Sequence, residues 1–93
     1  MMKSTTQIET VEGKRIAKRL LNHWKHKFEV EETEIYSKIL MPTATVTLTA
    51  QQQHLEVIIE NQQDNVERLE QVVIDHLNRM AQQEFAANWT HQE

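Results

Sequence analysis

The sequence predicts an α+β fold, a two-layer sandwich in which an antiparallel sheet carries two helices on one face, in the order β-α-β-β-β-β-α-β. Three observations support this prediction. Apolar residues recur every three or four positions in two separate segments, which is the period of a helix. They alternate with a period of two in the segments around those helices. The links between consecutive alternating segments are too short for crossovers, so these strands should be antiparallel.

A short strand is predicted first, at residues 4–10, which are β-prone and bounded by Gly13. The first helix is predicted over residues 12–27, where five apolar residues share one face: Ile16, Ala17, Leu20, Leu21 and Trp24. Thr10 can cap the start of this helix, and the basic residues near its end suit the negative end of the helix dipole.

Four more strands are predicted, at residues 28–31, 35–41, 44–50 and 54–60. A second helix is predicted to run to about Gln82, with a capping-box pattern formed by Asp64 and Glu67 at its start. Its apolar face consists of Val66, Leu69, Val73, Leu77 and Met80. The alternation of Phe85, Ala87 and Trp89 predicts a short last strand.

The composition limits the class of protein. With 93 residues, 39% of them hydrophobic, the chain should form one domain, residues 1–93, with an ordered core of about 5–90. The absence of cysteine excludes disulfides, thiolate zinc sites and cysteine nucleophiles, and the single glycine excludes glycine-rich phosphate loops. No apolar run suits a signal peptide or a membrane span, so we expect a cytoplasmic protein that does not bind membranes.

Three segments carry a resemblance to a known family: His23-Trp24-Lys25-His26-Lys27, Leu69-Glu70-Gln71-Val72-Val73 and His76-Leu77-Asn78-Arg79-Met80-Ala81. With Pro42 and Trp89, they make residues 5–89 resemble a small bacterial family catalogued as domain of unknown function 2218. The chain departs from the family pattern at Thr43, in place of the usual Phe-Gly after the proline, and at Met80, in place of an aromatic residue. The resemblance implies an α+β domain and a loose association with bacterial iron-uptake genes, but no established activity.

The histidines of these segments form the first candidate site. His23 and His26 are three residues apart on the first predicted helix, and His76 precedes Arg79 by three on the second. On a helical wheel, His23 lies about 90° from the centre of the apolar face, His26 on the opposite side, and His76 within the apolar stripe. We predict a ligand site at His23, His26, His76 and Arg79, with hydrogen-bonded structural roles for His76 and His26 as the alternative. No HExxH motif or aspartate cluster completes a metal-ligand set, so metal and cofactor stay open.

The second candidate is the basic surface of the first helix. Residues 12–27 carry a charge of about +5 and the rest of the chain about −9. Lys14, Lys18 and Lys25 lie on one flank, and Arg15 and Arg19 lie on the next. Such a stripe suits an anionic ligand or nucleic acid, with a merely solvated face as the alternative. The net charge of −4 makes nucleic acid the less favoured ligand.

The leading functional prediction is a non-catalytic binding or accessory module for a small ligand or protein partner. The resemblance adds an expected link to iron or siderophore uptake. One alternative is binding of nucleic acid or an anionic ligand through residues 12–27. Another is a small enzyme in which His76 acts with a carboxylate, that of Glu70, Asp75 or Glu84. A homodimer formed through a sheet edge is left open.

Overall fold

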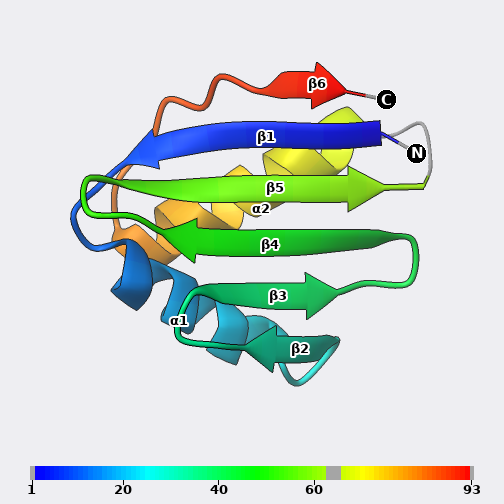
Figure 1. Cartoon of the computed structure of the whole chain (residues 1–93), viewed down its shortest axis with the longest axis horizontal. Coiled ribbons are helices and arrows are strands. Elements are labelled where there is room, and N and C mark those ends of the chain that lie inside the picture. Colours follow the sequence, from blue (N-terminus) through cyan, green and yellow to red (C-terminus); the bar gives the residue numbers. More distant parts are fainter. Residues whose placement is uncertain (1, 63–65, 93) are drawn as a thin grey trace.

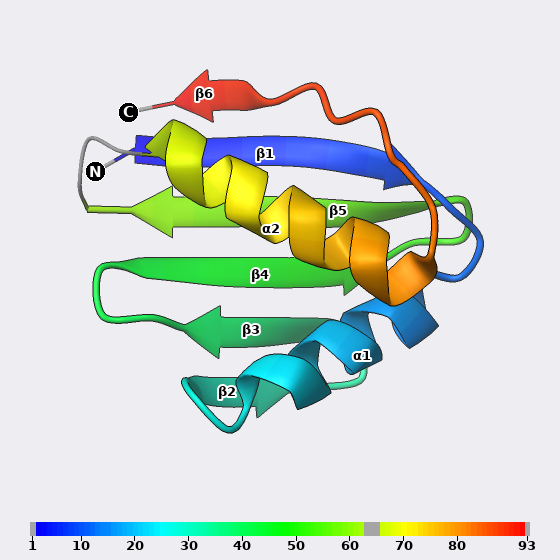
Figure 2. The same ribbon diagram turned by 180° about the vertical axis from the view of Figure 1, so that it is seen from behind.

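In the computed structural model, which describes residues 2–62 and 66–92, the strands form one antiparallel sheet in the order β2-β3-β4-β5-β1-β6 (Figure 1). The strands and helices follow each other in the predicted order. Their bounds are β1 (Met2–Glu9), α1 (Gly13–Trp24), β2 (Glu29–Glu32), β3 (Tyr36–Leu40), β4 (Ala44–Ala50), β5 (His54–Asn61), α2 (Val66–Ala81) and β6 (Thr90–Gln92). Both helices cover the same face of the sheet (Figure 2). The predicted α+β architecture is confirmed.

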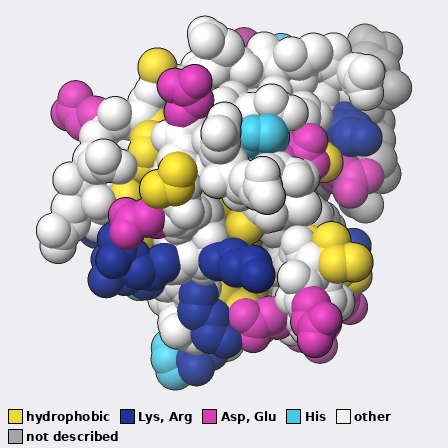
Figure 3. Space-filling model, turned by 60° about the vertical axis from the view of Figure 1, so that its left-hand side comes forward, with side chains coloured by type: hydrophobic (Ala, Val, Ile, Leu, Met, Phe, Trp, Pro, Cys, Tyr) yellow, Lys and Arg dark blue, Asp and Glu magenta, His cyan; other side chains and the backbone are white. Residues whose placement is uncertain are grey.

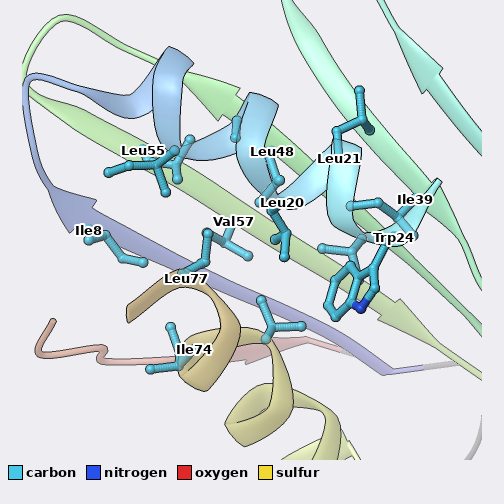
Figure 4. Close-up of a cluster of buried hydrophobic side chains, with 14 of the residues drawn as sticks. Ile8, Leu20, Leu21, Trp24, Ile39, Leu48, Leu55, Val57, Ile74 and Leu77 are labelled. Atoms are coloured by element: carbon cyan, nitrogen blue, oxygen red, sulfur yellow. The ribbon is translucent and has the colours of Figure 1, made fainter. Parts of the chain in front are cut away.

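The core lies between this helical layer and the sheet. From the helices, Leu20, Leu21, Trp24, Ile74 and Leu77 point toward the strands (Figure 4). They meet inward-facing strand residues that include Ile8, Ile39, Leu48, Leu55 and Val57. Leu20, Val73 and Leu77 are completely inaccessible to solvent. The apolar faces predicted for the two helices therefore share one interior.

Alternation along the strands sets the two faces of the sheet. In β4, Val46 and Leu48 are buried under the helices, whereas the threonines that alternate with them are half-buried on the other face. Val46 pairs with Ile39 of β3 and with Ile59 of β5, so one apolar row crosses three strands. The period of two read from the sequence reflects this division because successive strand side chains point to opposite faces.

The first helix is shorter than predicted at both ends. It begins at Gly13, and Thr10 accepts a hydrogen bond from the Glu12 N–H (3.1 Å), so Thr10 shapes the preceding turn and does not cap the helix. A Cβ on Gly13 would lie 3.2 Å from the Cβ of Ala50, so glycine permits a close approach to β4. The helix ends at Trp24, whose carbonyl accepts hydrogen bonds from the N–H groups of Lys27 and Phe28.

The last strand also differs from the prediction. Only Thr90–Gln92 pair with β1, opposite Thr5, Ser4 and Lys3, whereas residues 84–89 form no regular structure. Phe85, Ala87 and Trp89 do alternate in burial, as predicted. However, the Phe85 N–H donates to Oδ1 of Asn78 on α2 (3.0 Å), so this donor is not available to a strand ladder. The proposed capping residue of the second helix, Asp64, lies outside the described residues.

Candidate functional site

A groove of about 720 Å³ lies between α1 and the turn that joins β2 to β3. One wall carries Lys14, Arg15 and Lys18 from α1, and the opposite wall is formed by residues 32–36. Ala17, Ser37, Leu48 and Ala50 complete the lining. Lysine and arginine side chains gather on the surface at this end of the molecule (Figure 3). The groove therefore includes three of the five residues of the basic stripe read from the sequence.

Local structure explains how each wall is presented. The opposite face of α1 is buried through residues such as Ile16 and Leu20, which turns its basic flank outward. In the facing turn, the hydroxyl of Thr33 accepts hydrogen bonds from the N–H groups of Ile35 and Tyr36, at 3.1 and 3.0 Å. This side-chain-to-backbone turn leaves Ile35 73% exposed beside the groove.

Ion pairs partly neutralise the cations of the groove. The Lys18 ammonium group lies 2.8 and 3.0 Å from the two carboxylate oxygens of Glu32, so this pair links α1 to the end of β2. Arg15 contacts Glu12 at 2.7 Å. Lys14 forms no ion pair with any residue that the structure describes. Within the described residues, the groove thus contains the unpaired ammonium group of Lys14 and the ammonium group of Lys18, which is paired with a carboxylate.

The predicted histidine site is assembled in part. The ring of His76 is close to two rings of α1, with centroid distances of 4.8 Å to Trp24 and 5.4 Å to His23. Nδ1 of His76 is 2.7 Å from the carbonyl oxygen of Val72, one turn earlier in α2. His76 is half-buried, whereas His23 is exposed. The structure therefore brings His23 and His76 together at the junction of the two helices.

The other two predicted residues are not brought to this cluster by any contact. His26 is exposed in the turn after α1, on the outer side as its wheel position indicated. Arg79 is exposed on α2, and it makes no hydrogen bond or ion pair within the described residues. The arginine that does join the helices is Arg19, whose guanidinium donates to the carbonyl oxygen of Met80 (2.8 Å). This bond satisfies a carbonyl at the C-terminal end of α2.

The pairing of His76 with a carboxylate, on which the enzyme alternative depends, is absent among the described residues. Glu70 pairs with His91 of β6, at 2.6 Å between Oε2 and Nε2. Asp75 accepts a hydrogen bond from Gln71, and Glu84 is exposed in the segment before β6. Sequence reasoning missed His91. No local pattern indicates this histidine, because its partner Glu70 lies 21 positions away.

The pair of Glu70 and His91 lies close to a serine, because Ser4 is the cross-strand partner of His91. Serine, histidine and glutamate are the residue types of a hydrolytic triad. Ser4 is completely buried, and within the described part of the chain its hydroxyl has no hydrogen-bond partner. A substrate cannot reach a nucleophile in that position. This cluster is therefore structural, and it ties β6 to α2.

The two tryptophans lie in different places. Trp24 is buried in the core. Trp89 lines a groove of about 470 Å³ beside α2, together with Phe85 and the carboxylates of Glu67 and Glu84. No group of three or more histidine, aspartate or glutamate side chains within residues 2–62 and 66–92 is arranged to hold a metal ion.

The fold and these surfaces define a small α+β protein with a basic groove and an imidazole cluster on one helical layer. The chain belongs to the family described as "Uncharacterized protein conserved in bacteria (DUF2218)", whose family model matches residues 5–90. It is similar to a solved structure, "NMR structure of PA4090 from Pseudomonas aeruginosa". The two are 35% identical, with a TM-score of 0.82 over 97% of this chain and 96% of that chain. The family resemblance seen in the sequence is confirmed.

A search of curated proteins finds no match. Within the described residues, neither helix has the length and apolar character that crossing a bilayer requires.

Proposed function

We propose that this chain is a non-catalytic binding module whose groove between α1 and the β2–β3 turn takes a small organic carboxylate. The observation that carries the proposal is the ion pair between Lys18 and Glu32. Glu32 already places a carboxylate against a groove lysine, so the acid group of a ligand can occupy the same position. Lys14, which is unpaired among the described residues, then provides the second cation.

The charges and the lining support a monocarboxylate with an apolar body. The three cations of the groove face two carboxylates, Glu32 and Glu34, so the lining has little excess positive charge for a polyanion. The apolar side chains of Ala17, Ile35 and Leu48 provide contact surface for the rest of the ligand. Nucleic acid, with one phosphate after another, requires more unpaired cations than this groove offers.

The proposal is tested by following backbone amide signals by NMR during titration with benzoate, an aromatic monocarboxylate, and with benzamide, its uncharged analogue. Benzoate should shift the signals of residues 14–18 and 32–37, whereas benzamide should not. Lys18→Gln should weaken benzoate binding about tenfold, because a charge-assisted hydrogen bond is lost. Glu32→Gln should strengthen binding, because it removes the internal competitor for Lys18.

Lys25→Gln is the matched control, since Lys25 follows the end of α1 and does not line the groove. It should leave the benzoate affinity unchanged. Equal shifts with benzoate and benzamide, or equal losses in Lys18→Gln and Lys25→Gln, would refute the carboxylate site. Inorganic phosphate serves as a third probe. If it bound more tightly than benzoate, the apolar contacts that we assign to the ligand body would be wrong.

The wider setting of this function rests on the family resemblance. We propose a cytoplasmic accessory role connected to iron or siderophore uptake, in which the groove receives an acidic metabolite. In the host bacterium, deletion of the gene should slow growth under iron limitation, and the wild-type gene should restore it. A gene carrying Lys14→Gln and Lys18→Gln should fail to restore growth, and one carrying Lys25→Gln should succeed. Sedimentation would decide whether the functional form is a homodimer.

A further inference from the structure

We propose that His23 and His76 together form a binding site for a divalent transition-metal ion at the junction of α1 and α2. This site is separate from the carboxylate groove, since neither histidine lines that groove. Three features of the cluster carry the proposal: the hydrogen bond that orients His76, the distance between the two imidazole rings, and the access of solvent to His23.

The hydrogen bond of His76 prepares its ring for metal coordination. A carbonyl oxygen can only accept, so the 2.7 Å contact with Val72 requires that Nδ1 of His76 carries the proton. In this neutral tautomer Nε2 keeps its lone pair. Histidines that bind metals commonly donate their other ring nitrogen to a carbonyl or carboxylate in this way, which fixes the ring and raises its basicity.

The separation of the two rings suits two ligands of one metal ion. In a tetrahedral site with metal–nitrogen distances of about 2.1 Å, two imidazole rings have centroids roughly 5 Å apart. The rings of His23 and His76 are 5.4 Å apart and are tilted by 51°. Because His23 is exposed, its side chain can rotate to direct a ring nitrogen toward the ion.

The site is open. His23 is exposed and His76 half-buried, and no third histidine, aspartate or glutamate joins them in a ligand group within the described residues. Water or an added ligand therefore completes the coordination. Imidazole ligands suit copper, nickel and zinc, and the stability order of divalent ions places Cu²⁺ first. We expect Cu²⁺ to bind more tightly than Ni²⁺ and Zn²⁺.

Trp24 provides the readout, because its ring centroid is 4.8 Å from that of His76. The chain has two tryptophans, so the experiment uses the full-length Trp89→Phe variant, in which Trp24 is the only one. Titration with Cu²⁺ should quench the Trp24 fluorescence and saturate at one ion per chain. A parallel Zn²⁺ titration, followed by NMR of the histidine ring signals, should shift His23 and His76 but not His54.

His23→Gln and His76→Gln, each in the Trp89→Phe background, should weaken the Cu²⁺ affinity at least about tenfold, because each removes one of two imidazole ligands. His26→Gln is the matched control, since it removes an exposed imidazole three residues from His23. Its affinity should equal that of the parent. Thermal melts followed by circular dichroism show which variants are folded, and the exposed His23 provides a test even if His76→Gln unfolds.

Two outcomes would overturn the proposal. A loss in His26→Gln as large as that in His23→Gln would mean that Cu²⁺ binds a surface pair on one segment. Quenching that persists in both His23→Gln and His76→Gln would mean that the ion binds elsewhere on the chain. Neither outcome bears on the carboxylate groove, which is tested with different residues and probes.

Discussion

Gln82 follows the last residue of α2, and its backbone has a conformation that residues other than glycine rarely adopt. Its φ is 57°, in the left-handed region, and the N–H of the next residue, Gln83, donates to the carbonyl oxygen of Asn78 (3.1 Å). This is the arrangement that closes many helices, usually with glycine in the left-handed position. This chain has glutamine instead of glycine at that position, so the residue opposes its own helix end.

We predict that Gln82→Gly stabilises the protein by about 1 kcal/mol, because glycine adopts a positive φ without a steric penalty. The free energy of unfolding in urea measures the effect. Gln83→Gly is the control, since Gln83 does not have a positive φ. That change should give no gain. If both variants were equally stable, the backbone of Gln82 would not be under strain.

Glu70 shows how one pair of residues connects two distant elements. The residue is only 7% exposed, and its carboxylate contacts His91, the central residue of β6. A buried carboxylate without a hydrogen-bond partner is costly, so His91 stabilises the position of Glu70 as well as that of β6.

His91→Ala should reduce the free energy of unfolding by about 1–2 kcal/mol, because the buried Glu70 carboxylate loses its partner. Thr90→Ala, in the same short strand, should have little effect. Adding Glu70→Gln to His91→Ala should recover part of the loss, since a neutral amide is less costly to bury. Urea denaturation of the four proteins measures these differences. Equal stability of His91→Ala and Thr90→Ala would contradict this role of the pair.

At the scale of elements, the rotation of α2 about its axis decides which residues reach the core. Val73 and Leu77 are completely buried, whereas Val72, on the neighbouring stripe, is 36% exposed. The same rotation places His76 against Trp24 of α1. A helix turned by one residue would remove both the apolar contacts and the imidazole cluster.

Leu77→Ala should cost about 2–5 kcal/mol of stability, since it leaves a cavity in the interior between the helices and the sheet. By contrast, Lys18→Ala should change stability by about 0.5 kcal/mol or less, because its ion pair with Glu32 is exposed to solvent. Urea unfolding of both variants checks the prediction. A Leu77→Ala protein as stable as the parent would mean that α2 is rotated differently.

The two edges of the sheet limit pairing with another chain in different ways. β2 carries Glu29, Glu31 and Glu32, and these like charges oppose the addition of another copy of the same strand. At the other edge, β6 pairs with only three residues of β1. Such a short edge strand also offers few backbone groups for pairing.

At the scale of the whole molecule, basic and acidic residues are unevenly distributed along the chain. Residues 12–27 carry a charge of about +5, and the rest of the chain is negatively charged. Some of these basic side chains form contacts within the protein. Lys18 and Arg15 form ion pairs, and Arg19 binds a carbonyl of α2. Three of the six basic residues of this segment are therefore already engaged within the protein.

We predict that the protein does not shift a DNA or RNA duplex in a gel, even at low salt. Any non-specific binding should be weaker than a dissociation constant of about 10⁻⁴ M, the weak limit for proteins that bind nucleic acids. A shift of the nucleic-acid band that weakens steeply as the salt concentration rises would contradict this prediction. Its loss on neutralising Lys14, Arg15, Lys18 and Arg19 would establish helix α1 as a nucleic-acid surface.

The order of the elements and the inward faces of both helices are readable from the sequence alone. Each depends on buried residues that recur at a fixed spacing along the chain. Leu20, Val46 and Leu77 are examples, since other buried residues of the same face lie within a few positions of each. The basic stripe that lines the groove is readable for the same reason. Only the opposite wall, with Glu32 and Ile35, had no signal that linked it to α1.

The contacts on which the sites depend were decided by tertiary structure. Lys18 and Glu32 are 14 positions apart, Glu70 and His91 are 21 apart, and His23 meets His76 only because α1 and α2 pack side by side. No local pattern specifies such pairs. The start of β6 was misplaced for a related reason: the Phe85 N–H donates to the Asn78 side chain of α2 and not to a neighbouring strand. The sequence alone determined the fold, because burial follows a periodic pattern within each segment. The residue that each side chain contacts was decided by the tertiary structure, because it depends on how the helices pack on each other and on the sheet.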